Sequence, residues 1–325
     1  MRLSLVPRML ATTRPPDVAL LHTSMPRGGR VSLGIEVNIL PAVIEEVRRR
    51  GGLVIAQLNR NMPYTFGDGE IDVCDVDLGL EVDAPIPTGA PSVVDDVAEA
   101  IGARAAGAAT DGCTIQVGIG RIPDAVLRKL TERRGIGVWS ELISDGIMRL
   151  ERAGALDVSR PITSTFVVGS AELYAWVDAN PRLVLRRTER VNHPASIAAQ
   201  PAMLSINAAM QVDLSAQSNA SFADGRIFSG FGGQPDFVAG ALHSSGGQAI
   251  IVLPAWHPRS AASTIVARLT SPVTSFQHTE VVTEHGSARL FGRSQREQAQ
   301  ALIEEAADPS AREELRDAAR RLSLA

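Results

Sequence analysis

Two short segments of the sequence combine residue types that could do chemistry together. Residues 118–122 read GIGRI, and Glu141 follows Ser140 further along the chain. Glycines leave a turn without Cβ atoms, so its backbone can approach a ligand closely. The free N–H groups of a helix that begins there suit an anion or a carbonyl oxygen. The two segments are therefore a candidate site in which the Glu141 carboxylate faces a ligand held by the glycine loop.

The elements around these segments are expected to bring them to one edge of a sheet. The pattern predicts a strand over residues 113–117, a helix over 123–134 and a second strand over 136–139. Parallel strands joined by a right-handed crossover end on the same edge, where open α/β sheets bind ligands. A Gly-x-Gly turn alone is weak evidence, and a tight turn beside a solvent-exposed Glu is the competing interpretation.

A second glycine cluster, in residues 229–237, could bring further N–H groups to a ligand. Gly230, Gly232 and Gly233 would let the backbone form an oxyanion hole. The competing interpretation is a flexible surface loop. Further on, Glu284 and His285 are expected at another strand end.

Other catalytic motifs lack their key residues. Pro123 stands where a dinucleotide-binding fingerprint needs its third glycine, and there is neither a G-x-S-x-G elbow nor a P-loop. NAD, serine-hydrolase and nucleotide-hydrolase chemistry are therefore disfavoured. No two histidines have the spacing of metal ligands, so no metal site is expected.

The remaining pattern alternates between strands and helices, which predicts an α/β fold. Aromatic residues are only 4% of a chain that is 45% hydrophobic, a balance that favours helices packed on buried parallel strands. Strands are predicted at residues 17–24, 33–37, 53–59, 163–168, 183–186, 203–206 and 249–253, and helices at 41–50, 93–109 and, as a charged amphipathic pair, 293–324.

A domain boundary is predicted within residues 84–92. This segment reads APIPTGAPS, and its prolines and glycine cannot continue a helix or a central strand. The boundary separates an N-terminal domain, residues 1–88, from a C-terminal domain, residues 92–325.

The composition indicates which partners the protein can bind and in which compartment it works. A net charge of -4 over 325 residues gives no basic surface for nucleic acid. Cys74 and Cys113 are the only cysteines, which indicates neither a disulfide framework nor a zinc site. Neither a signal peptide nor a membrane-spanning segment is expected, so we predict a cytoplasmic protein that does not bind membranes.

Five ordered blocks resemble the acetyl-CoA hydrolase/transferase family, which includes 4-hydroxybutyrate CoA-transferases. They are QVGIGRIPDAVL, GVWSELISDGIM, VNHPASIAAQPAMLSINAAMQVDL, SGFGGQPDFVAGALHSSGG and VVTEHGSARLFGRS, and the earlier NRNMPYTFGDGEIDVCDVD resembles the family's first domain. The resemblance covers nearly the whole chain. It implies two open α/β domains that face each other across a cleft. The family pattern begins upstream of Met1, which implies that the first domain is incomplete and has an exposed sheet edge.

The resemblance also implies a chemistry and its residues. Glu141 would attack an acyl-CoA thioester, pass through an anhydride and carry CoA as a glutamyl thioester before an acceptor acid takes it. The expected partners are acyl-CoA and small carboxylic acids of the acetate, butyrate or 4-hydroxybutyrate type, with CoA as substrate and no tightly bound cofactor. The implied oxyanion and CoA contacts are Gly118, Ile119, Gly120, Arg121, Ile122, Gly230, Gly232 and Gly233, and the expected substrate pocket holds Gln116, Gln211 and Gln234.

The sequence leaves two alternative functions open, and three of its residues differ from the family pattern. Water in place of an acceptor acid would make the protein an acyl-CoA hydrolase, and a shortened chain could bind CoA without turning it over. Gln211 stands where the family pattern has Glu, Gln248 where Lys is frequent and Thr264 where Arg is frequent, which bears on CoA-phosphate contacts and acid specificity. A homodimer is the default expectation for the assembly.

Overall fold

A nine-stranded sheet forms the centre of the computed structural model, which describes residues 1–325 except 90–91, 224, 258–259, 274 and 276. All of its neighbouring strands are parallel except the β22–β23 pair at one edge. In sheet order the strands are β23 (Ser287–Arg289), β22 (Glu280–Val282), β18 (Gln248–Val252), β13 (Met203–Ala208), β7 (Thr114–Val117), β8 (Gly137–Trp139), β10 (Ile162–Ser164), β12 (Leu183–Leu185) and β4 (Phe66–Gly67).

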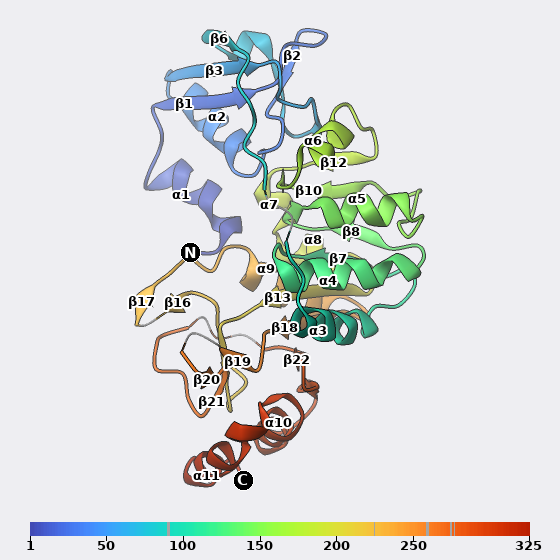
Figure 1. Ribbon diagram of the computed structural model, residues 1–325. Helices are drawn as coiled ribbons and strands as arrows, with labels where there is room; N and C mark the ends of the chain where they lie inside the picture. The colour runs from blue at the N-terminus through green and yellow to red at the C-terminus, as the bar shows by residue number, and fades with distance from the viewer. Residues whose placement is uncertain (90–91, 224, 258–259, 274, 276) are drawn as a thin grey trace.

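Helices cover both faces of this sheet, which explains why its strands are continuous apolar runs. The helices that connect parallel strands cover both faces of the sheet and shield its strands from water. All four residues of β7 are buried. In Figure 1, α3, α4 and α5 stack along one face, while α9 packs beside β13 and β18 and α8 packs against α9. The helices are α1 (Val6–Thr12), α2 (Leu40–Arg49), α3 (Asp96–Gly107), α4 (Arg121–Lys129), α5 (Asp145–Arg152), α6 (Ala171–Val177), α7 (Thr188–Val191), α8 (Pro194–Ala198), α9 (Gln234–His243), α10 (Gln295–Ala301) and α11 (Arg312–Arg321).

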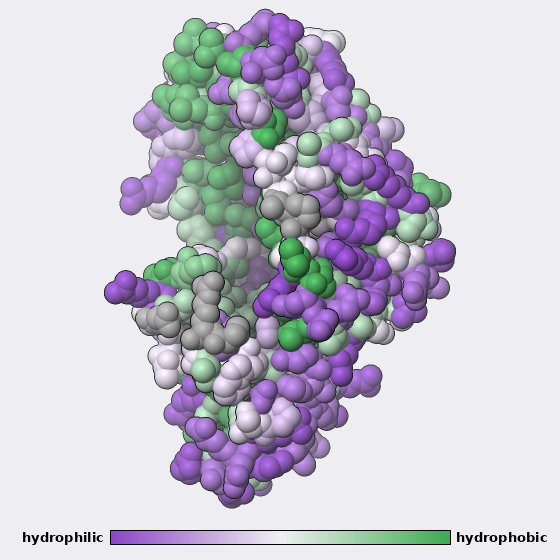
Figure 2. Space-filling model, viewed as in Figure 1, coloured by the Kyte–Doolittle hydropathy of each residue, from purple (hydrophilic) through white to green (hydrophobic). Residues whose placement is uncertain are grey.

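A separate three-stranded parallel sheet lies at the top of Figure 1, in the order β1 (Val18–Thr23), β3 (Leu53–Asn59) and β6 (Leu78–Val82). Helix α2 packs on one face, where Ala19, Val54 and Ala56 are buried. The other face is apolar and open: Leu20 is 76% exposed and Leu80 is 66% exposed. Figure 2 shows a hydrophobic surface at the upper left, over the part of the molecule that holds this sheet in Figure 1.

Short strands complete the fold. They are β2 (Arg30–Ser32) with β5 (Glu70–Asp72), β9 (Leu142–Ile143) with β11 (Phe166–Val167), β14 (Gln211–Asp213) between β15 (Ser218–Asn219) and β21 (Ile265–Val266), β16 (Phe222–Ala223) with β17 (Arg226–Ile227), and β19 (Trp256–His257) with β20 (Ala262–Ser263). Among the described residues, none of the helices combines the length and apolar character needed to span a bilayer.

The structure confirms the predicted α/β class and the predicted parallel pairing of β7 with β8. Helix α4 begins at Arg121, two residues before the predicted start. Gly120, at a φ of 116°, forms its N-cap, and a proline in the first turn is tolerated.

The predicted strand over residues 33–37 is wrong. The strand there is β2, which ends at Ser32, because Gly34 then turns the chain at a φ of 66°. The predicted strand over residues 163–168 divides into β10 and β11, because Thr165 leaves the ladder to bond the carbonyl of Glu141. Part of the predicted linker, residues 90–91, lies outside the described residues.

Candidate active site

The Glu141 backbone is fixed at the carboxyl edge of the large sheet, between β8 and β9. Its carbonyl oxygen accepts hydrogen bonds from the Thr165 N–H at 3.0 Å and the Thr165 hydroxyl at 2.7 Å. The Ser164 hydroxyl also donates to it at 3.0 Å and the Phe166 N–H at 3.3 Å. So many donors on one oxygen hold the residue in place independently of its side chain.

Two further segments hold the Glu141 carboxyl group. Its Oε2 accepts a hydrogen bond of 2.6 Å from Nδ2 of Asn192, a fully buried residue directly after α7. On another side lies Gly233, the N-cap of α9, where a Cβ would stand 1.7 Å from this oxygen and 2.3 Å from Asn192 Nδ2. Only glycine fits there, so the carboxyl group is positioned against a backbone wall.

Burial of Glu141 is the main cause that raises its pKa above the usual range. The negative charge of Asp236 raises it further, and the Asn192 hydrogen bond opposes both effects. Asp236 is fully buried in the first turn of α9, where it accepts hydrogen bonds from the N–H and hydroxyl of Ser4. A partly desolvated carboxylate is a stronger nucleophile than one in bulk water, because less hydration must be removed before attack.

Another carboxyl group, that of Glu36, is close enough to interact with Glu141. Glu36 forms an antiparallel bridge with Phe166, and the next residue, Val37, donates its N–H to the Thr165 carbonyl at 3.1 Å. Burial raises the pKa of Glu36 to about 7, and the charge of Glu141 adds to the shift, whereas Asn38 lowers it.

The first glycine loop lies at the carboxyl end of β7, as expected from the crossover. A Cβ on Gly118 or Gly120 would meet no atom within 4 Å, so the space beside the loop is open. Both glycines and Ile119 line a cavity of about 540 Å³, together with Arg128 and Arg149. The side chains of the last two residues of the loop turn elsewhere. Arg121 pairs with Asp95, and Ile122 is buried in the core.

The second glycine cluster contributes one residue in contact with Glu141. Gly233 touches its carboxyl group, whereas a Cβ on Gly230 or Gly232 would meet nothing within 4 Å. Gly232 instead accepts a hydrogen bond from the Leu3 N–H at 3.1 Å through its carbonyl.

The three glutamines of the expected substrate pocket lie in different surroundings. Gln116 is buried and accepts a 2.6 Å hydrogen bond from Ser205. Gln211 accepts a long one, 3.4 Å, from Asn219. Gln234 begins α9 directly after Gly233 and lines a cavity of about 300 Å³. Its amide nitrogen is buried without a hydrogen-bond partner in the described part of the chain. Of the three glutamines, Gln234 is the one that directly follows a residue in contact with the Glu141 carboxyl group, Gly233.

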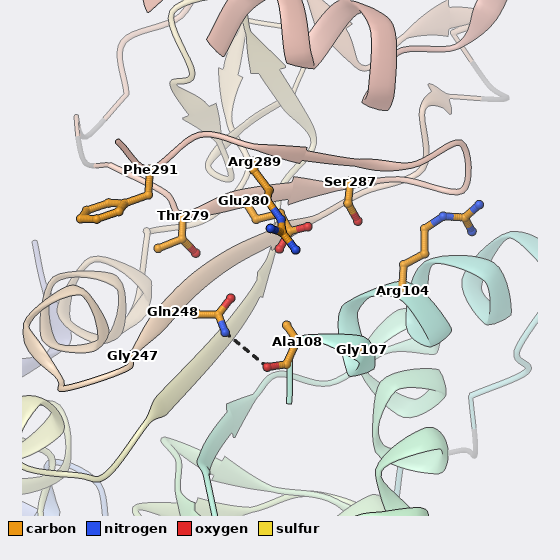
Figure 3. Close-up of a pocket in the computed structure, with 10 residues that line it drawn as sticks. All are labelled: Arg104, Gly107, Ala108, Gly247, Gln248, Thr279, Glu280, Ser287, Arg289 and Phe291. Atoms are coloured by element: carbon orange, nitrogen blue, oxygen red, sulfur yellow. Dashed lines mark hydrogen bonds between the residues drawn. The ribbon is translucent and has the colours of Figure 1, made fainter. Parts of the chain in front are cut away.

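The cavity of about 840 Å³ drawn in Figure 3 lies at the opposite, amino edge of the large sheet. Gln248, the first residue of β18, donates to the Ala108 carbonyl there at 3.3 Å. Thr264 is also structural, since its hydroxyl donates to the Pro254 carbonyl at 2.6 Å. All three departures from the family pattern thus form hydrogen bonds within the chain, that of Gln211 being the long one to Asn219.

Glu284 and His285 have local structural roles. The Glu284 carboxylate accepts a hydrogen bond of 2.8 Å from the Ala255 N–H, and the His285 ring lies 3.3 Å from the Asp308 carboxylate. Among the described residues, no group of three or more His, Cys, Asp or Glu side chains is placed to hold a metal ion.

Sequence reasoning missed the residues that hold the nucleophile candidate. Asn192 lies within the block VNHPAS, so the resemblance could have pointed to it. Asp236 likewise lies within the block SGFGGQPDFVAGALHSSGG, whereas Thr165 and Glu36 lie in none of the blocks, and only the fold brings them to Glu141.

Comparison with known proteins identifies the family. Residues 169–319 match the model of the acetyl-CoA hydrolase/transferase C-terminal domain, and relatives at 30% identity or more extend the match to nearly the whole chain. The chain belongs to the acetyl-CoA hydrolase/transferase family, which confirms the resemblance seen in the sequence.

Individual relatives are longer than this chain. It is 38% identical over 322 residues to a 4-hydroxybutyrate coenzyme A transferase of Clostridium kluyveri, a match that covers 95% of this chain and 74% of the relative. Among solved structures, RipA from Yersinia pestis superposes with a TM-score of 0.94 at 30% identity, covering 100% of this chain and 75% of RipA. A 4-hydroxybutyrate CoA-transferase from Porphyromonas gingivalis gives 0.88 at 32% identity, covering 98% and 79%.

Proposed function

We propose that the protein transfers CoA between a short-chain acyl-CoA and a carboxylic acid, with Glu141 as the covalent nucleophile. The observation that carries this proposal is the Glu141 carboxyl group, bonded to Asn192 at 2.6 Å and packed against the Gly233 backbone. Family membership supports the same chemistry.

The proposed reaction is a double displacement in which Glu141 is regenerated. A carboxylate oxygen of Glu141 attacks the thioester carbonyl and expels CoA thiolate, which gives an acyl-glutamyl anhydride. The thiolate then attacks the glutamyl carbonyl and releases the donor acid as its carboxylate. An acceptor carboxylate repeats the two steps in reverse order and leaves as a new acyl-CoA. These steps need CoA as substrate, in the form of acyl-CoA, together with the acceptor acid, and they need no bound cofactor.

Asn192 and Gly233 are proposed to act on different states of this cycle. The Asn192 amide orients the carboxyl group before attack and lowers its pKa, which favours the ionised form that attacks. The absence of a side chain at Gly233 makes room for the Glu141 carboxyl group itself, so the Gly233 backbone lies directly beside the reacting group. Fixed backbone N–H groups near such a site stabilise the oxyanion that forms on the reacting carbonyl.

The cavity beside Gly118 and Gly120 is the proposed entry for CoA. Besides the loop, Arg128, Arg149 and Arg152 line it, and guanidinium groups are well suited to phosphate. Contacts to this remote part of the substrate can supply binding energy that is expressed at the thioester.

Acyl-CoA hydrolysis is the second candidate, because the matched family includes hydrolases. The two reactions differ only in whether an acid or water attacks the glutamyl thioester. CoA release measured with and without acceptor acid separates them: transfer requires that new acyl-CoA appear in proportion to the acid consumed. Free thiol formed at the same rate without any acid would favour hydrolysis.

The central experiment compares Glu141→Gln with Glu132→Gln. Glu132 is exposed, so its substitution changes the same chemical group outside the site. Exchange of CoA between acetyl-CoA and labelled acids should fall to background in E141Q and stay at the wild-type rate in E132Q. Wild-type exchange by E141Q would overturn the proposal.

We also propose a cytoplasmic homodimer. The two cysteines, neither of which is in a disulfide, suit a reducing compartment, and two-fold homo-oligomers are the commonest assembly. The mass in solution, measured by light scattering on a size-exclusion column, tests the dimer, which a monomeric mass would exclude.

A further inference from the structure

The Glu36 segment and Glu141 both contact the backbone of Thr165 and Phe166. The Thr165 and Phe166 N–H groups hold the Glu141 carbonyl, and on the other side Glu36 bridges to Phe166. Three independent backbone contacts, Val37 to Thr165, Asn38 to Thr165 and Val167 to Ile35, fix the register of the Glu36 segment. The backbone segments that carry the two carboxyl groups are therefore fixed relative to each other.

The charges around this pair are mostly negative. Asp236 adds a third carboxyl group beside Glu141. Arg2 lies 3.8 Å from Asp236, and His193 also acts on that carboxylate. Within the described residues, neither Glu36 nor Glu141 forms an ion pair with a basic side chain. The basic groups Arg2 and His193 act on Asp236, so a second negative charge on a bound acid would meet no cation that is paired with Glu36 or Glu141.

Glu36 differs from the other two acids in its access to solvent. Residue Glu36 keeps solvent-exposed surface, although the atoms packed around its carboxyl group still raise its pKa, whereas Asp236 is fully buried and Glu141 is half-buried. An acid that approaches Glu141 from solvent can therefore meet Glu36 before the reacting carboxyl group.

We propose that Glu36 determines which acids accept CoA, an inference that rests on the proposed CoA transfer. Glu36 disfavours dicarboxylic acids and admits monocarboxylic acids whose far end is uncharged or carries a hydroxyl group. A carboxylate at the far end of the acceptor is repelled by Glu36, whereas a hydroxyl group can donate a hydrogen bond to it.

The reaction cycle places this repulsion at the step where the acceptor binds. In the glutamyl-CoA intermediate Glu141 is neutral, so its charge no longer opposes ionisation of Glu36. Loss of the Glu141 charge removes one of the two causes that raise the pKa of Glu36, so ionisation of Glu36 is opposed less when the acceptor enters, with burial as the remaining opposing cause. Removal of one like charge within several ångströms at a protein surface is expected to change relative rates by roughly tenfold.

The test compares 4-hydroxybutyrate with succinate as acceptors of CoA from acetyl-CoA. Both acids have four carbons and differ only at the far end, which is a hydroxymethyl group or a carboxylate. Wild-type protein should have the higher kcat/KM for 4-hydroxybutyrate. Glu36→Gln should raise the succinate-to-hydroxybutyrate ratio by about tenfold, whereas Glu36→Asp, which keeps the charge, should leave succinate disfavoured.

Two results would overturn the inference: an unchanged ratio in E36Q, or a wild-type preference for succinate. Transfer to neither acid by the wild type, nor to any other acid, would refute the proposed function itself. A salt series on the wild type needs no variant to fold. Because salt screens exposed charges, the succinate-to-hydroxybutyrate ratio should rise with ionic strength, and a flat ratio would contradict the role of Glu36.

Discussion

Replacement of Gly233 by alanine tests how closely the backbone confines the Glu141 carboxyl group. The added Cβ would lie 1.7 Å from Oε2 and 2.3 Å from Asn192 Nδ2, and real Cβ contacts below 3.0 Å are essentially absent. The backbone itself accepts alanine, since Gly233 has a φ of -90°. The side chain of Glu141 must therefore move by more than 1 Å, and its 2.6 Å hydrogen bond cannot survive unchanged.

A displacement of this size in a nucleophile costs on the order of 100-fold in rate, equivalent to roughly 2.7 kcal/mol in the activation free energy. The assay is the exchange of CoA between acetyl-CoA and a labelled acid, with kcat and KM measured separately. We expect most of the loss in kcat, because the substituted group lies at the reacting carboxyl rather than along the CoA-binding cavity.

Gly107→Ala is the matched control. Gly107 ends α3, and a Cβ there would meet no atom within 4 Å. Both variants should keep the wild-type circular dichroism spectrum, and G107A should keep the wild-type rate. A rate for G233A within threefold of wild type, or an equal loss in both variants, would refute the close packing of Gly233 against Glu141.

Three further predictions concern single side chains. Asn192→Ala removes a hydrogen bond to a charged group, which should cost about 10- to 100-fold in kcat/KM. The acid limb of the pH profile of this variant should move to higher pH, because the lost bond lowers the pKa of Glu141. A pH profile identical to that of the wild type would contradict the role of Asn192 in holding the Glu141 carboxyl group. Because the folded-state pKa of Glu36 is raised to about 7, its ionisable group contributes stability that is full below the unfolded value of 4.5 and is lost as the pH rises through 7. Glu36→Gln should therefore raise Tm relative to wild type more at pH 8 than at pH 5, and an equal change at both would count against that pKa. Leu20→Lys, on the open face of the β1–β3–β6 sheet, should change the free energy of unfolding by no more than about 0.5 kcal/mol; a loss above 2 kcal/mol in urea denaturation would show that this face is covered in solution.

The sequence was sufficient for the parts of the fold that depend on local pattern. Continuous apolar runs predicted β3 and β7 to within a residue. In β7 this run reflects burial on both faces, whereas β3 is buried on one face and is partly exposed on the other. The crossover rule then placed the Gly118 loop and Glu141 on one edge of the sheet. Turns were less predictable. Gly34 turns the chain after β2 at a positive φ, and the Met62 side chain, 28 positions away, leaves no room for a Cβ there.

The surroundings of Glu141 could not be predicted in the same way, because they come from distant parts of the chain. Asn192 is 51 positions from its partner, and Gly233 reaches the same oxygen only through the packing of α9. Long-range contacts of this kind carry no spacing rule. The resemblance to a family marked the blocks that contain both residues, whereas it gave no indication of Glu36, whose place follows from its bridge to Phe166.

The most direct test of the account is the detection of CoA on Glu141. The protein is incubated with acetyl-CoA, digested and analysed by mass spectrometry, with half of the sample treated with borohydride. We predict a CoA adduct on the peptide that contains Glu141, which borohydride reduces to an alcohol, and neither product in Glu141→Gln. An unmodified Glu141 peptide in protein that turns over acetyl-CoA, or an adduct on a different residue, would contradict the assignment of this carboxyl group as the nucleophile.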